Sequence, residues 1–145
     1  MGIYQTQAIN QQSDKVLKLS VKGLSDISVS PPPEFGGPEG YLTPEDLFSA
    51  SISTCFILTF KAISRAKKLD WKSIDVKVEA KLEKSQQGLK FTTVDIFPVL
   101  TICCKENVDP YLELLAKAKD SCLVTKSMNC DFSVHPKIKL EMVKK

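Results

Sequence analysis

The residues of this chain that could do chemistry are its five cysteines and a single histidine, His135. The cysteines stand at positions 55, 103, 104, 122 and 130. The sequence contains no CxxC pair, glycine-rich phosphate loop, GxSxG or paired histidines, so a zinc site or a Cys-His nucleophile pair is poorly supported. We therefore predict no metal, no cofactor and a structural role for His135. An odd number of unequally spaced cysteines favours a reducing compartment, which predicts a cytoplasmic protein.

Two of the thiols have settings that bear on reactivity. Cys55 lies within LFSASISTCFILTF, residues 47–60, a run without a single charge. Burial in the middle of such a helix raises a thiol pKa unless a cation or a hydrogen-bond donor offsets it. Cys122 is expected in the first turn of a short helix, where unpaired backbone amides and the helix dipole stabilise a thiolate. The other three cysteines, Cys103, Cys104 and Cys130, are expected to pack as small apolar side chains.

The elements that must position these thiols follow from hydrophobic periodicity. Near-alternating apolar residues predict strands over residues 3–9, 15–23, about 25–30, 74–82, 91–104 and 132–142. Cap and proline signals predict helices over residues 44 to about 68, 111 to about 119, and 121 to about 129. The order βββαββααβ separates strands from helices, which predicts an α+β fold with antiparallel sheets around a central buried helix.

Size and charge narrow the class of protein. At 145 residues and 43% hydrophobic residues, the chain suits one domain over residues 1–145. A net charge of +3, spread without blocks, gives no basic stripe, so we expect no nucleic acid partner. The N-terminus lacks the features of a signal peptide, and the longest uncharged apolar run is shorter than the ~18 residues of a spanning helix. We expect no membrane association.

The first predicted helix has apolar side chains in nearly every direction, because successive residues advance by ~100° around the axis. Such a helix must be buried on more than one side. In a chain this small, we expect a partner subunit to bury the second apolar side of the helix.

Two motifs resemble the OsmC/Ohr family of osmotically inducible and organic hydroperoxide resistance proteins. The first is GGPEGYLTPEDLFSASISTCF, which contains Glu45 and Cys55, and the second is DSCLVTKSM, which contains Cys122. The likeness covers residues 36–60 and 118–142, and the predicted strand order agrees. The resemblance implies an intertwined homodimer with sites at its interface.

The activity that the resemblance implies is that of a thiol peroxidase. Cys55 would attack an organic hydroperoxide and form a sulfenic acid, Cys122 would resolve it as a disulfide, and an external dithiol would reduce the disulfide. Glu45 would be the site carboxylate that holds an arginine over the sulfur. An apolar wall suited to an organic substrate would come from Leu47, Phe48, Phe56 and Phe60.

Two features leave alternatives open. Glu45 precedes Cys55 by ten residues, about 15 Å of helical rise, so the two must meet through a kink, a long loop or, as we favour, the neighbouring subunit. The chain also has no arginine before Arg65. A lysine of the N-terminal strands would have to supply a positive charge, the candidates being Lys15, Lys18 and Lys22. The alternative function is a non-catalytic OsmC-like dimer that binds a small apolar ligand or senses redox state.

Overall fold

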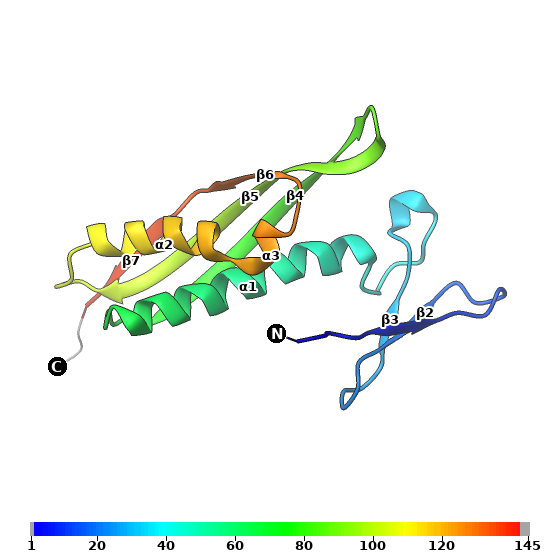
Figure 1. The fold of residues 1–145 in the computed structure, drawn as a ribbon, viewed down its shortest axis with the longest axis horizontal. Helices are drawn as coiled ribbons and strands as arrows, with labels where there is room; N and C mark the ends of the chain where they lie inside the picture. Colours follow the sequence, from blue (N-terminus) through cyan, green and yellow to red (C-terminus); the bar gives the residue numbers. More distant parts are fainter. Residues whose placement is uncertain (1, 143–145) are drawn as a thin grey trace. The chain divides into compact units, whose positions relative to one another are not determined.

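The computed structural model describes residues 2–142 and divides the chain into two compact units, Met1–Phe48 and Ser49–Lys145. Each unit has a sheet of its own, and the sequence boundary between them falls near the start of the long helix α1 (Figure 1). The single domain expected over residues 1–145 stays a prediction.

The N-terminal unit is built on a three-stranded antiparallel meander. Its strands are β1 (Gln7–Ile9), β2 (Leu17–Ser20) and β3 (Ile27–Val29), which pair in the order β1-β2-β3. The predicted meander is therefore confirmed, with strands shorter than the alternating pattern suggested. A 3-10 turn (Pro33–Phe35) occupies the proline-rich loop. After it, a side chain at Gly37 would collide with the carbonyl oxygen of Pro31, 1.7 Å from the position of its Cβ.

Helix α1 (Pro44–Ala66) begins at a reciprocal cap. The amide of Asp46 donates to Thr43 Oγ1 at 3.0 Å, and the amide of Thr43 donates to Asp46 Oδ2 at 3.1 Å. This cap satisfies two amides that would otherwise lack partners at the helix start, so the predicted beginning of the helix is confirmed. The helix then continues without interruption through Cys55.

The C-terminal unit holds a four-stranded sheet. A long antiparallel hairpin is formed by β4 (Ser73–Ser85) and β5 (Gly88–Cys103), and its turn contains Gly88 with a φ of 97°. On the other side of β5, β6 (Asp131–Val134) and β7 (Lys137–Glu141) pair with it in parallel.

The predicted α+β class around a long helix is confirmed, but the C-terminal sheet is mixed. The connection from β5 to β6 crosses the sheet through α2 (Asp109–Ser121) and α3 (Leu123–Lys126), which returns the chain in the direction of β5. The single strand expected over residues 132–142 is wrong. The strand ends at Val134 and the next begins at Lys137, on either side of Pro136.

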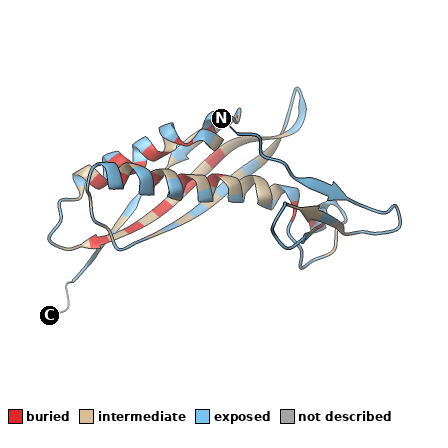
Figure 2. Cartoon of the chain, turned by 60° about the horizontal axis from the view of Figure 1, so that its bottom comes forward, coloured by how far each residue is buried: buried red, intermediate tan, exposed pale blue. Residues whose placement is uncertain are grey.

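All three helices of the C-terminal unit lie on one face of this sheet (Figure 1, Figure 2). The core between them is formed by alternate residues of β5 and by one side of α1 and of α2. Its fully buried members include Val94, Ile96, Leu100, Ile102, Ile52, Phe56, Phe60, Tyr111, Leu114, Leu115 and Ala118. Trp71 closes one end, because its ring meets Phe60 edge-on and its Nε1–H donates to Ser64 Oγ at 3.0 Å.

The opposite side of α1 has no such cover within the described residues. Leu58 is 65% exposed there, so the burial on several sides that the sequence predicted is not provided by this chain alone. By length and composition α1 is long and apolar enough to cross a membrane. A single helix of this kind is weak evidence for a membrane protein. The face of α1 that carries Ile52, Phe56 and Phe60 is buried against its own sheet.

Candidate active site

The centre of the candidate site is a pair of cysteines from different elements. Cys55 lies in the middle of α1, and Cys122 occupies the cap position between α2 and α3. Each thiol influences the pKa of the other, and both thiols are free. Although 67 positions separate them in sequence, the fold brings the two thiols near enough for each to affect the other's pKa.

The position of Cys122 is set by how α2 ends. Its backbone is extended, with φ −69° and ψ 119°, so the chain leaves one helix there and enters the next. Thr125 fixes this corner, because its Oγ1 donates to the carbonyl oxygens of Lys119 and Cys122 at 2.9 and 3.0 Å. The thiol of Cys122 is directed inward and has no exposed surface.

The surroundings of the Cys55 sulfur favour a thiolate. Burial is the largest influence and raises the pKa of Cys55. The hydrogen bonds that lower this pKa come, in decreasing order, from the Cys122 thiol, the Val124 backbone, the Thr59 hydroxyl and the Leu123 backbone. Together they outweigh burial, so the pKa of Cys55 lies below its ordinary value.

Cys122 is affected in the opposite direction. Burial raises the pKa of Cys122 most, and the hydrogen bond and the negative charge of Cys55 raise it further. Hydrogen bonds from the backbone of Thr125 and Val124 offset only part of this effect. As the pH rises, Cys55 therefore loses its proton first while Cys122 remains a thiol that donates to it.

This order is the reverse of what the two sequence settings suggested. The sequence placed the thiolate-stabilising amides around Cys122, at the start of the short helix. In the structure, the backbone of Val124 and Leu123 helps to lower the pKa of Cys55, whereas burial of Cys122 outweighs the backbone hydrogen bonds that it receives from Thr125 and Val124.

An apolar hollow of about 480 Å³ opens beside Cys55. It is formed by one side of α1 and the first residues of α3, and it is lined by Ser51, Thr54, Cys55, Leu58, Thr59, Ala62, Ile63, Leu123 and Val124. Leu58 and Leu123 are 65% and 71% exposed, so the hollow is accessible from solvent.

The predicted apolar wall does not line this hollow. Phe56 and Phe60 have no exposed surface and belong to the core that faces the sheet, because they point about 100° and 140° away from Cys55 around the helix. Leu47 and Phe48 are partly buried near the start of α1 and are also outside the lining. The residues that sequence reasoning missed are Thr59, Leu58, Leu123 and Val124. For Thr59 a signal existed, since it lies four residues after Cys55 and so on the same helix face.

Neither Glu45 nor a basic residue is among the groups that shift the pKa of Cys55 in the described residues. Glu45 is in the first turn of α1, and the helix runs without a break from there to Cys55, ten residues later. Arg65 is exposed in the last turn, about 15 Å of helical rise beyond Cys55. Among residues 2–142, no lysine or arginine is one of the groups that shift the pKa of Cys55.

The remaining candidate groups lie away from the thiol pair. Cys130 donates to the carbonyl oxygen of Phe91 at 3.4 Å, and burial raises its pKa. His135 contacts Asp95 Oδ1 through Nε2 at 2.8 Å and stacks on Phe97 at 4.9 Å between ring centroids. These contacts join the residue that follows β6 to β5. The described residues contain no cluster of three His, Cys, Asp or Glu side chains that could hold a metal ion.

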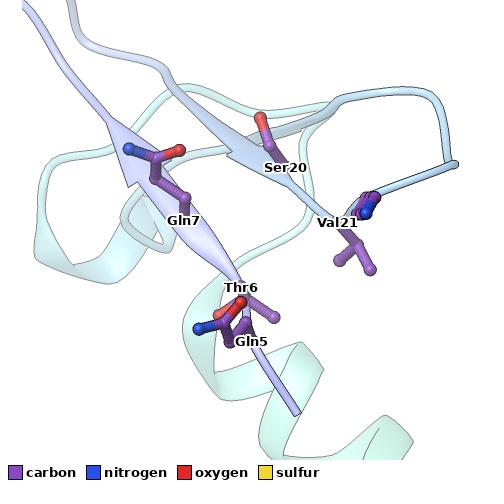
Figure 3. Close-up of a pocket in the computed structure, with 6 residues that line it drawn as sticks. Gln5, Thr6, Gln7, Ser20 and Val21 are labelled. Atoms are coloured by element: carbon purple, nitrogen blue, oxygen red, sulfur yellow. The ribbon is translucent and has the colours of Figure 1, made fainter.

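A second hollow, of about 540 Å³, lies on the N-terminal unit along β1 and the end of β2 (Figure 3). Its lining is Gln5, Thr6, Gln7, Ser20, Val21 and Lys22. Most of its lining side chains carry amide or hydroxyl groups, and none carries a thiol or a carboxylate. The hollow beside Cys55 is therefore the better candidate for an active site.

The comparisons with known proteins agree with this fold. The model of a family described as OsmC-like protein matches residues 36–137. An OsmC-like protein of unknown function from Vibrio cholerae superposes with a TM-score of 0.84 at 18% identity, covering 94% of this chain and 99% of that one. An organic hydroperoxide resistance protein, OsmC, from Legionella pneumophila gives 0.76 at 22% identity, covering 94% and 99%.

A third structure, an organic hydroperoxide resistance protein from Elizabethkingia anophelis, gives a TM-score of 0.78 at 17% identity, covering 97% of this chain and 98% of that one. No curated protein matches the chain. At these identities the solved structures establish the shared fold alone.

Proposed function

Since the chain belongs to the OsmC-like protein family, we propose that it is a thiol peroxidase that reduces organic hydroperoxides. Cys55 is the attacking thiolate and Cys122 the resolving thiol. The observation that carries this proposal is the proximity of the two thiols, each of which shifts the pKa of the other, with only the pKa of Cys55 lowered. The similarity to proteins described as organic hydroperoxide resistance proteins supports it.

The reaction begins at the Cys55 sulfur. The thiolate attacks the distal oxygen of ROOH, so that an S–O bond forms, the O–O bond breaks and RO⁻ leaves to take a proton and become the alcohol. The sulfur is oxidised to a sulfenic acid. Cys122 then attacks this sulfur, its proton leaves with the hydroxide as water, and a disulfide remains. An external dithiol reduces that disulfide and restores both thiols.

The hollow beside Cys55 supports an organic substrate rather than hydrogen peroxide. Its lining is mainly aliphatic, with Leu58, Ile63 and Leu123 around the partly exposed sulfur. Burial of an alkyl or aryl group against this surface stabilises the complex by about 25 cal/mol per Å² of apolar area. Hydrogen peroxide has no such group and gains nothing there.

A homodimer completes the proposed site. The exposed side of α1 carries Leu58, and β4 pairs on one side only among the described strands. A second copy covers the apolar surface of α1 and supplies Glu45 to the neighbouring thiol. Light scattering should give twice the mass of the 145-residue chain, whereas a monomer at working concentration would contradict this arrangement.

The decisive experiment is stopped-flow oxidation of the reduced protein by cumene hydroperoxide. We expect rapid loss of thiol and formation of a disulfide between Cys55 and Cys122. Cys55→Ser should abolish the reaction, and Cys122→Ser should divert it to over-oxidation of Cys55. Cys130→Ser is the matched control, because Cys130 is also a partly buried thiol but lies outside the pair.

The same experiment separates the alternative function. The apolar hollow would also suit a non-catalytic dimer that holds a small apolar ligand. If the thiols of the wild-type protein survive excess cumene hydroperoxide for minutes, the peroxidase proposal fails and ligand binding becomes the better account of this hollow.

A further inference from the structure

The side chain next to the Cys55 sulfur on its own helix is that of Thr59. It lies one turn further along α1, with Oγ1 at 3.8 Å from Cys55 Sγ, and both residues line the same hollow. We propose that Thr59 is a catalytic residue whose hydroxyl donates a hydrogen bond to the Cys55 thiolate. This inference rests on the proposed peroxidase function and identifies a group that activates its attacking sulfur.

A thiolate in an apolar hollow requires donors to replace the water it loses. Four groups supply them here, and none is a cation among the described residues. Two are backbone donors of Leu123 and Val124, and one is the Cys122 thiol, which is itself consumed when the disulfide forms. Thr59 is therefore the side-chain donor that takes no part in the redox change.

The direction of the bond follows from the charge of the sulfur. A protonated thiol could donate to the threonine oxygen, but a thiolate can only accept, so the hydroxyl of Thr59 must donate. Threonine suits this role because branching at Cβ restricts its χ1 angle and keeps the hydroxyl in place.

A neighbouring threonine on the same helix shows the contrast. Thr54 Oγ1 donates to the carbonyl oxygens of Ala50 and Ser51 at 2.7 and 3.3 Å, which is the usual bond of a helical threonine to the preceding turn. The hydroxyl of Thr59 faces the sulfur instead. Its position is thus specific to the environment of Cys55.

The test is the rate at which iodoacetamide alkylates Cys55 in the reduced protein between pH 5 and 10, followed by mass spectrometry of the Cys55 peptide. Thr59→Val keeps the shape and removes the donor, and we expect it to slow alkylation near neutral pH about fivefold, the effect of one modest hydrogen bond. The pH midpoint should move upward. Thr59→Ser restores the donor and should behave like the wild type.

Ser53→Ala is the control, because it removes a hydroxyl of α1 that bonds to the carbonyl oxygen of Ala50 at 3.1 Å and is absent from the hollow. It should leave the alkylation profile unchanged. If Thr59→Val is alkylated like the wild type, the inference is overturned. If Thr59→Val does not fold, Thr59→Ala compared with Thr59→Ser decides in the same way.

Alkylation reports the thiolate and needs no peroxide, so the two proposals fail separately. A wild-type protein whose Cys55 is alkylated fast but is not oxidised by cumene hydroperoxide would refute the peroxidase function and leave the hydrogen bond of Thr59 standing. When both hold, oxidation by cumene hydroperoxide should slow in Thr59→Val by the same factor as alkylation.

Discussion

Oxidation of Cys55 and Cys122 to a disulfide should stabilise the protein against unfolding. The bond would close a loop of about 68 residues, and the chain-entropy relation gives about 4 kcal/mol for a loop of that size. Most of this gain should be realised, because the two free thiols already lie near enough to shift each other's pKa and little native structure has to move. Unfolding entropy of about 2.1 cal/mol/K per residue converts 4 kcal/mol into a rise in Tm of about 13 °C for this chain.

Urea unfolding of the oxidised and the dithiothreitol-reduced protein, at one protein concentration, measures this difference. Trp71 is the only tryptophan and packs on Phe60, so its fluorescence reports loss of the core. Cys122→Ser treated with the same oxidant should show no gain, and Cys130→Ser should show the full gain. An oxidised wild type that unfolds at the same or lower urea concentration would contradict an unstrained disulfide between Cys55 and Cys122.

Two further outcomes follow from other parts of the molecule. Thr43→Ala removes one half of the reciprocal cap with Asp46 and should lower the free energy of unfolding by about 1 kcal/mol in urea titrations; a change near zero would show that water replaces the cap without loss. The reduced protein should lose stability as pH rises above the ordinary thiol pKa, because groups with raised pKa values keep their protons in the folded state while the unfolded chain releases them. These groups are Cys122, Cys130 and Tyr111. Cys55 acts in the opposite sense: because its pKa is lowered, its contribution to the free energy of unfolding is lost as pH falls. Urea midpoints that rise steadily from pH 8 to 10 would contradict the expected net loss of stability.

Local signals in the sequence predicted several elements well. Thr43 followed by a proline and two acidic residues located the start of α1, and the alternating apolar residues on either side of Gly88 located the hairpin of β4 and β5. Each of these features depends on residues close together in the chain. The parallel pairing of β6 and β7 with β5 depends instead on the route of the chain through α2 and α3, which no local pattern encodes.

The composition of the site shows the same limit. The apolar residues of α1 were evident, but whether a given side chain faces the core or the hollow depends on where the sheet and α3 lie around the helix. Phe56 follows Cys55 directly and yet points into the core. The relative acidity of Cys55 and Cys122 was likewise reversed, because it depends on which thiol turns inward and which one meets the backbone of α3.

The unequal acidity of the two thiols suits the order of steps in the proposed reaction. While Cys55 is a thiolate, its charge and hydrogen bond help to keep Cys122 protonated, so the resolving thiol does not compete for the peroxide. Formation of the sulfenic acid removes that negative charge. The backbone hydrogen bonds of Val124 and Thr125, which lower the pKa of Cys122, remain and now meet less opposition. In the proposed reaction, Cys122 thus becomes a better nucleophile at the moment when Cys55 becomes an electrophile, because the charge of each thiol acts on the other.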